Sequence, residues 1–148
     1  MKKIIIGSDH AGFKLKEDVK KFLKNIHYKV KDCGTDSEES VDYPNIGKKV
    51  AKDVAKEKCF GILICGSGIG MSIVANKVKG IRAALCHDEN TAEVARKHNN
   101  SNILCLGSRV LEDGDAKRIV KRYLETEFSD EERHKRRVDE IKDIECSS

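Results

Sequence analysis

The 148-residue chain has little of several features that mark particular classes of protein. It has a single proline and only 5% aromatic residues, which indicates long regular elements around a core of isoleucine, valine and leucine. No stretch approaches the roughly 18 apolar residues that a membrane-spanning helix needs. The apolar run in MKKIIIGSDH at the N-terminus is also far too short for a signal peptide. We therefore expect a cytosolic, cytoplasmic protein with no membrane partner.

Paired cysteines are missing as well. The six cysteines are scattered, form no CxxC pair, and in several cases fall in or beside apolar runs. In a chain of this size without a signal peptide, this pattern favours buried free thiols over a disulfide framework. The spacings of histidine and cysteine match no zinc template, so we predict no metal site.

Charged residues are abundant, but the two signs are mixed. Lysine and arginine number 29 and aspartate and glutamate 25, which gives a net charge of +4. The charges alternate with aliphatic residues at regular spacing, so the chain does not have the composition of a disordered protein. This mildly basic balance is compatible with an anionic ligand and does not require nucleic acid. The length suits one hydrophobic core, and we predict a single domain over residues 1–148.

Apolar periodicity predicts strands and helices that alternate along the chain. The expected strands are residues 3–8, 28–32, 60–65, 81–86 and 102–106. The expected helices are residues 13–26, 44–58, 71–79, 90–98, 115–126 and 130–144. The alternation predicts an α/β fold of the doubly wound, Rossmann- or flavodoxin-like kind: a three-layer sandwich with about five parallel strands and an extra C-terminal helix. Ligands of such folds bind beyond the carboxyl ends of the strands, which here are residues 8–12, 65–70, 87–88 and 107–109.

One of these segments, in ILICGSGIGMSIVANKV (residues 62–78), places Gly66, Gly68 and Gly70 between a strand and a helix. The spacing GxGxG departs from the dinucleotide fingerprint GxGxxG, and the P-loop signature is absent. Unobstructed backbone amides at a helix N-terminus suit a phosphate or an oxyanion that develops during a reaction. The alternative is a glycine-rich turn that binds nothing.

Two polar groups flank this glycine loop. Cys65 is the last residue of the preceding strand, where the helix N-terminus favours the thiolate form, although a small buried hydrophobe is the alternative. Ser67 could bind a substrate oxygen or merely cap the helix. Asp9 and His10 end the first strand in SDHAGF, at the same crevice, although Asp9 is equally suited to capping the helix that follows.

Further candidates are basic or polar residues near helix ends. His98 and Asn99 end a helix in RKHNNSN, where a histidine is often only a partner of the helix dipole. Arg133 and Arg137 stand four residues apart in ERHKRRVDE, so they share a helical face and could clamp a phosphate. The run RHKRR could equally be a solvated face or a weak nucleic-acid patch, which the acidic residues after it argue against. Arg109, in LGSRV, is a third basic group at the crevice.

Taken in order, these stretches resemble ribose-5-phosphate isomerase of the B type, in the family that also holds galactose-6-phosphate isomerase subunits. The motifs that carry the resemblance are SDHAGF (8–13), GT…DYP (34–44), ICGSGIGMSIVANK (64–77), GIRAALC (80–86), HNNSNILCLGSRV (98–110) and RHKRRV (133–138). They span almost the whole chain. Ser67 stands where some members have threonine, and this difference keeps the hydroxyl.

The resemblance implies an aldose–ketose isomerase without metal or cofactor that interconverts ribose 5-phosphate and ribulose 5-phosphate, in the non-oxidative branch of the pentose phosphate pathway. It assigns Cys65 as the base that removes the C2 proton and His98 as the group that opens the furanose ring, and we add Ser67 to the catalytic candidates. The substrate-binding residues that follow from it are Asp9, His10, Gly66, Ser67, Gly68, Ile69, Gly70, Asn99, Arg109, Arg133 and Arg137. It also implies a homodimer or homotetramer whose active sites are built from two subunits.

Two other functions stay open at this point. An isomerase of a hexose 6-phosphate, such as galactose or allose 6-phosphate, would keep the chemistry and change the substrate. The presence of Cys65, His98 and the arginines in one chain favours a self-sufficient homo-oligomer over the galactose enzymes, which divide these residues between two subunits. A non-catalytic sensor of a phosphate ligand would need the glycine loop but neither Cys65 nor His98.

Overall fold

The computed structural model describes residues 2–112 and 114–147, and over these residues the chain forms five strands and six helices. The strands are β1 (Lys3–Ser8), β2 (Lys29–Asp32), β3 (Phe60–Cys65), β4 (Ala83–Leu85) and β5 (Ile103–Gly107). The helices are α1 (Phe13–Asn25), α2 (Tyr43–Glu57), α3 (Ile69–Asn76), α4 (Glu89–Asn99), α5 (Asp115–Glu125) and α6 (Glu132–Ser147). Every predicted element is present.

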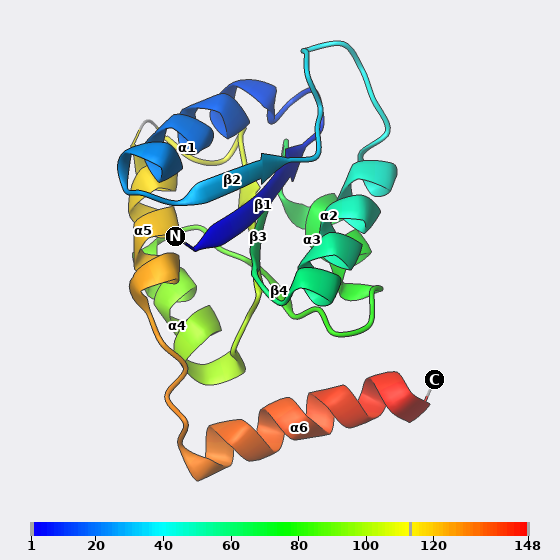
Figure 1. Cartoon of the computed structure of the whole chain (residues 1–148), viewed down its shortest axis with the longest axis vertical. Coiled ribbons are helices and arrows are strands. Elements are labelled where there is room, and N and C mark those ends of the chain that lie inside the picture. The colour runs from blue at the N-terminus through cyan, green and yellow to red at the C-terminus, as the bar shows by residue number, and fades with distance from the viewer. Residues whose placement is uncertain (1, 113, 148) are drawn as a thin grey trace.

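All five strands run parallel, in the order β2-β1-β3-β5-β4. The chain leaves β1 for β2 on one side and then crosses to β3 on the other side. The strand order therefore reverses between β1 and β3, and a crevice forms beyond their carboxyl ends, where folds of this kind bind ligands. Figure 1 shows both strands pointing toward the long loop between β2 and α2, with α6 at the opposite end of the molecule.

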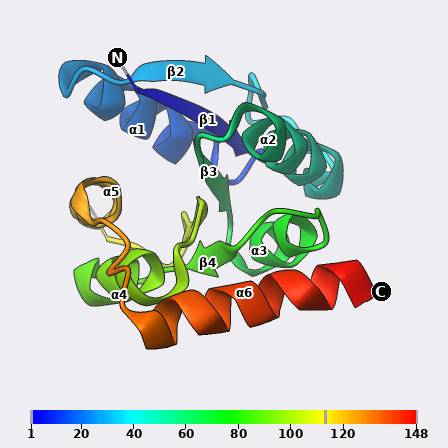
Figure 2. The same cartoon turned by 60° about the horizontal axis from the view of Figure 1, so that its bottom comes forward.

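Helices cover both faces of the sheet (Figure 2). Alternate residues of the central strands point to opposite faces: Ile64 packs under α1, α4 and α5, whereas Leu63 packs under α2 and α3. Because both faces are buried, these strands are continuous apolar runs in the sequence. The prediction of a doubly wound, three-layer α/β fold is confirmed.

Most element boundaries differ from the prediction by one to three residues, and for β4 and α3 the structure shows a local reason. β4 begins two residues later than expected, because the amide before it and the amide of its first residue bond to side chains and not to a neighbouring strand. The Arg82 amide donates to Asn102 Oδ1 and the Ala83 amide to Asn76 Oδ1, each at 2.8 Å. The second bond also ends α3 at Asn76, three residues earlier than the apolar pattern indicated.

Helix α6 lies outside the three layers and crosses the amino-terminal edge of the sheet, beside α4. Two of its side chains, His134 and Val138, are buried. Ile141 and Ile144 remain 38% and 68% exposed, so most of the apolar stripe predicted along this helix is not covered within the chain.

The six cysteines are free, and three of them, Cys65, Cys86 and Cys105, are buried. Burial raises the pKa of Cys86 to about 11 and also raises that of Cys105, so these two remain protonated core thiols. Within the described residues, no helix has the length and apolar character to cross a bilayer. Over the same residues, no three His, Cys, Asp or Glu side chains cluster as metal ligands would.

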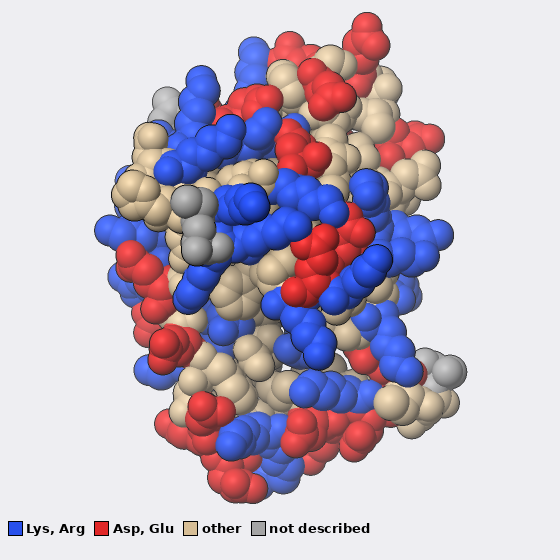
Figure 3. Space-filling model, viewed as in Figure 1, with Lys and Arg blue, Asp and Glu red and all other residues tan. Residues whose placement is uncertain are grey.

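Charges on the face in Figure 3 are intermingled. A network of ion pairs joins β1, β2 and α2: Lys3 pairs with Glu57, and Lys31 pairs with Asp53 at 3.0 Å and with Glu57 at 3.1 Å. Its carboxylates form a red patch enclosed by lysines, and both colours also appear along α6 at the bottom of the view. The RHKRR run therefore belongs to a mixed surface and not to the uniform basic stripe typical of a nucleic-acid interface.

Candidate active site

The loops that follow β1, β3 and β5 are tied together at the carboxyl edge of the sheet. The Asp9 amide donates to the Ile64 carbonyl at 3.2 Å, and the Ser108 amide donates to the Cys65 carbonyl at 2.9 Å. The Ser108 hydroxyl reaches across to the Ala11 carbonyl at 2.8 Å. These bonds make the three loops one unit, so Asp9 and Cys65 are held in a fixed relation.

Cys65 is the last residue of β3 and is 5% exposed. Its Sγ accepts a hydrogen bond from the Gly68 amide at 3.2 Å. Gly68 has φ +78°, and a Cβ there would lie 2.5 Å from a Leu85 methyl carbon and 2.9 Å from the Leu106 carbonyl carbon. Only glycine therefore lets the loop curl over the sulfur. A backbone amide at the start of α3, with the helix dipole behind it, stabilises negative charge on this sulfur.

Arg109 follows β5 and lies against the glycine loop. Its amide donates to the Gly66 carbonyl at 2.9 Å, and a Cβ on Gly66 would lie 3.1 Å from its guanidinium nitrogen. Ser67 is exposed in the same loop, and its hydroxyl oxygen accepts the Ile69 amide at 3.2 Å. The Ser67 hydroxyl thus accepts the first amide of α3 from just outside the helix, whose N-cap is Gly68, and its own proton can be donated to a ligand.

Asp9 and His10 both bond to backbone amides near the crevice. Asp9 is buried, and its Oδ1 accepts the Gly12 amide at 3.0 Å, immediately before α1. Asp9 therefore orders the turn before α1 but is not its N-cap, as the alternative interpretation of the sequence had it, because Gly12 takes that position and no side chain caps this helix. His10 Nδ1 accepts the Val41 amide at 3.2 Å, which places the proton of the neutral ring on Nε2 and anchors the loop between β2 and α2. The 87–88 segment lies at the same edge, where Asp88 caps α4 by accepting the Thr91 amide at 2.7 Å.

Tyr43 is a site residue that the sequence reasoning missed. A Cβ on Gly70 would lie 2.7–2.8 Å from three atoms of the Tyr43 side chain, so the phenol ring covers this end of the glycine loop. The side chain is 37% exposed. Its signal in the sequence was an aromatic residue in DYP, directly before the proline that starts a helix.

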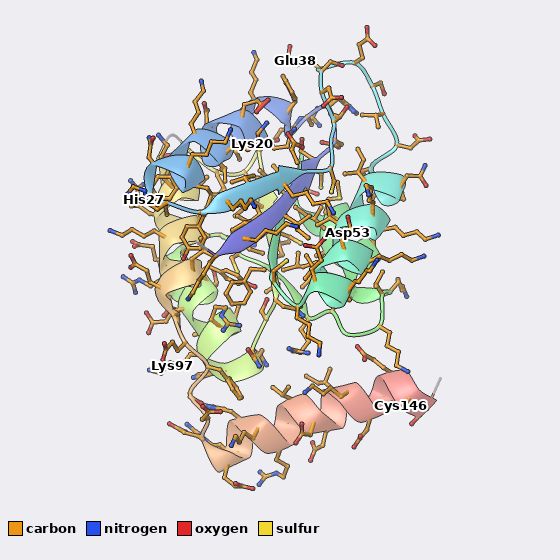
Figure 4. All side chains as sticks on the ribbon, viewed as in Figure 1. Lys20, His27, Glu38, Asp53, Lys97 and Cys146 are labelled. Carbon is orange, nitrogen blue, oxygen red and sulfur yellow. The ribbon has the colours of Figure 1, made fainter. Side chains whose placement is uncertain are left out.

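His98 and Asn99 lie at the opposite edge of the sheet. They end α4, and the chain then enters β5 from its amino end, where the Asn102 carbonyl accepts the Gly61 amide at 2.9 Å. Gly61 lies near the start of β3, four residues before Cys65, which corresponds to about 13 Å of strand. Figure 4 shows the same separation: Lys97, beside His98, lies next to the start of α6, far from Glu38 in the loop above the carboxyl edge.

The start of α6 joins this second group. The rings of His98 and His134 are stacked, with centroids 4.4 Å apart and planes at 25°. Arg133 and Arg137 flank His134 and are exposed, and Arg133 Nε donates to a Glu131 carboxylate oxygen at 3.0 Å. His134 was also missed by the sequence reasoning, because it is hidden in the charge run. Its signal was the four-residue spacing to Val138, which places both on the buried face of the helix.

The candidates thus form two groups and not one. The carboxyl-edge group contains Asp9, His10, Cys65, Gly66, Ser67, Gly68, Ile69, Gly70 and Arg109. The amino-edge group contains His98, Asn99, Arg133 and Arg137. A helix that follows a parallel strand ends where the next strand begins, so residues at the end of α4 cannot lie beside the end of β3.

Known proteins resemble this chain in both sequence and structure. The sequence profile of a family described as Ribose/Galactose Isomerase matches residues 4–141. Ribose-5-phosphate isomerase B of Escherichia coli is 45% identical over 146 residues, which cover 98% of this chain and 97% of that protein.

Solved structures agree with the sequence comparison. The Clostridium thermocellum ribose-5-phosphate isomerase B superposes with a TM-score of 0.95 at 50% identity and 98% coverage of both chains. The Mycoplasma genitalium ribose-5-phosphate isomerase B, solved with bound ribulose-5-phosphate, superposes with a TM-score of 0.94 at 42% identity, covering 99% of this chain and 97% of that one. The chain belongs to the Ribose/Galactose Isomerase family.

Proposed function

We propose that this protein is an aldose–ketose isomerase that interconverts D-ribose 5-phosphate and D-ribulose 5-phosphate in the cytoplasm. The observation that carries the proposal is the position of Cys65. Its sulfur lies at the carboxyl end of β3, at the point where the strand order reverses, under the Gly68 amide 3.2 Å away. The other buried thiols, Cys86 and Cys105, have a raised pKa because of burial.

Cys65 is the base of the isomerisation in this proposal. Its thiolate removes the proton from C2 of the open-chain aldose, and the electron pair of the C–H bond forms a C1–C2 double bond while the aldehyde oxygen becomes an oxyanion. The same thiol returns the proton to C1, and the proton of the C2 hydroxyl moves to the oxygen on C1, which leaves a ketone at C2. The amides of the glycine loop stabilise the enediolate because they are already oriented before charge develops.

His98 opens the furanose ring, and the arginines hold the phosphate. An imidazole gains and loses a proton near neutral pH, so His98 can take the proton of the anomeric hydroxyl and donate one to the ring oxygen. Arg109, Arg133 and Arg137 suit a dianionic phosphate at the far end of the sugar. Binding energy at the phosphate then orients the reacting carbons.

One chain cannot supply both halves of this site, so we propose that two copies do. Ring opening and C2 deprotonation act on adjacent atoms of one sugar, whereas Cys65 and His98 lie about 13 Å or more apart. Cavities of about 750 Å³ under α6 and 770 Å³ between α2 and α3 are lined by other residues, not by Cys65. Exposed apolar side chains support association in a homodimer or homotetramer: Ile69, Ile73, Val94, Val110, Ile141 and Ile144.

A direct assay tests the proposed function. Ribose 5-phosphate is incubated with the protein in the presence of EDTA, and formation of ribulose 5-phosphate is followed over time. We expect turnover in the wild type, none in Cys65→Ala, and normal turnover in Cys59→Ala. Cys59 is a suitable control because it is a partly buried free thiol at the other end of the same strand, one residue before β3 begins.

The alternatives give different outcomes in the same experiment. Turnover of galactose or allose 6-phosphate in place of the pentose would identify a hexose phosphate isomerase. Binding of a phosphorylated ligand by the wild type and by Cys65→Ala, with no turnover of any of these sugars, would identify a sensor and refute the proposal.

A further inference from the structure

His134 is buried against the residue to which we assign ring opening. It is 4% exposed, although its neighbours Arg133 and Lys135 are exposed. Its ring stacks on that of His98, with centroids 4.4 Å apart and an angle of 25° between the planes. This contact lies where the end of α4 meets the start of α6, near Lys97 in Figure 4.

Ser129 fixes the His134 ring. The Ser129 amide donates to the Lys97 carbonyl at 3.1 Å, which ties the segment before α6 to the end of α4. Its hydroxyl lies 2.6 Å from His134 Nδ1, and the hydroxyl oxygen also accepts the Glu131 amide at 3.2 Å. The assignment that satisfies both contacts has the hydroxyl donating to Nδ1, so the neutral His134 ring carries its proton on Nε2. The His134 ring therefore cannot tilt without breaking its bond to Ser129 or its stack on His98.

The surroundings of His134 keep it uncharged. The charged or titratable groups that face it are His98 and Lys97 from α4, Glu131 from the preceding turn, and Arg133 and Arg137 from α6 itself. Burial lowers the pKa of His134, and the charges of His98, Arg133 and Arg137 lower it further, whereas Glu131 opposes them. Two imidazolium ions stacked at this distance repel each other. The His134 ring is therefore neutral near neutral pH and places no positive charge against His98.

We propose that His134 is a positioning residue for His98, whose ring it holds in one plane and leaves free to carry the proton used in ring opening. This inference rests on the proposed role of His98. His134 also links the ring-opening residue to the phosphate-binding residues, because Arg133 and Arg137, the proposed phosphate ligands, flank it on α6. A shift of α6 would move the phosphate clamp and the His98 ring together.

Three variants separate the parts of this role. His134→Ala removes the stacked ring, and we expect kcat for ribose 5-phosphate to fall by about tenfold, with a smaller loss for an open-chain analogue. His134→Phe keeps a ring of similar size in the stack, so kcat is largely rescued. Ser129→Ala keeps the His134 ring but removes the hydroxyl that fixes it, so we expect a loss of kcat between those of the Phe and Ala variants. His27→Asn, at an exposed turn far from the site, is the control.

The NMR signal of the His98 ring reports the stack without any reference to activity. We expect the His98 Cε1 proton to carry a ring-current shift that His134→Ala abolishes and His134→Phe preserves; thermal unfolding confirms that each variant is folded. An unchanged signal in His134→Ala would overturn the proposal. Equal losses of kcat in the Ala and Phe variants would overturn it too, since they indicate that the stacked ring does not position His98. A wild type that shows the ring-current shift but no isomerase activity would refute the proposed function and leave the stack intact.

Discussion

The separation of Cys65 and His98 leads to a quantitative prediction about subunit mixing. If each active site takes Cys65 from one chain and His98 from its partner, Cys65→Ala and His98→Asn homodimers are both inactive. A mixed dimer then has one site with both residues intact and one site with neither. Random assortment of equal amounts makes half of the dimers mixed, and each of these has one working site of two. Mixing should therefore restore about a quarter of wild-type activity.

The assay needs subunits that exchange. The two variants are coexpressed with different tags, or are unfolded together and refolded, and the formation of ribulose 5-phosphate is compared with that of each parent alone. As a control, Cys65→Ala is mixed with the double variant Cys65→Ala/His98→Asn, a combination that offers no intact site and stays inactive. Activity in the mixture that does not exceed the sum of the parents, although mixed oligomers are present, would refute the division of the site between chains.

Three further predictions concern the same loops and the core beneath them. Cys65→Ala should abolish isomerisation but leave the Kd for ribose 5-phosphate within a few-fold of the wild type; near-normal turnover would show that the sulfur is not the base. Gly68→Ala combines φ +78° with a 2.5 Å contact and should destabilise the protein by about 2 kcal/mol or more in urea unfolding. Gly80→Ala, at φ +88° with only an ordinary 3.7 Å contact to the Ala55 Cβ, should cost only about 1 kcal/mol. Equal costs for the two variants would contradict the packing argument. Burial raises the pKa of Asp32, but the bonds from Lys16, 2.6 Å away, and from its other partners lower this pKa by more. The ionised Asp32 therefore stabilises the folded protein above about pH 3.9, and this stabilisation is lost as the pH falls through the lower folded-state pKa. In Lys16→Met, the free energy of unfolding should depend less on pH in that range than in the wild type. An unchanged pH dependence would argue against the Lys16–Asp32 ion pair as its source.

Much of the fold could be predicted from the sequence because its signals are local. The runs 3–8 and 60–65 are continuous and apolar, as strands covered on both faces must be, and the amphipathic segments between them have helical spacing. Element boundaries are harder to predict, because the start of β4 and the end of α3 depend on side-chain oxygens of Asn102 and Asn76, which accept amides 20 and 7 residues away in sequence.

The carboxyl-edge group could also be located in advance. Asp9 and Arg109 follow predicted strands and Cys65 ends one, and parallel strands bring their carboxyl ends to one edge whatever their order. The amino-edge group could not be located in this way. The position of His98 relative to Cys65 depends on where α4 ends in space, and that of His134 on how α6 packs against α4.

The sequence by itself therefore determined the alternation of strands and helices, the edge at which the first group of ligand-binding candidates meets, and the residue types that the chemistry needs. Only the tertiary structure decided that His98, Asn99, Arg133 and Arg137 lie at the other edge, that Tyr43 covers the glycine loop, and that His134 stacks on His98. The physical reason is that periodicity and turn chemistry act between residues that are close in sequence. The distance between two sheet edges and the packing of one helix end on another arise only when the whole core has assembled.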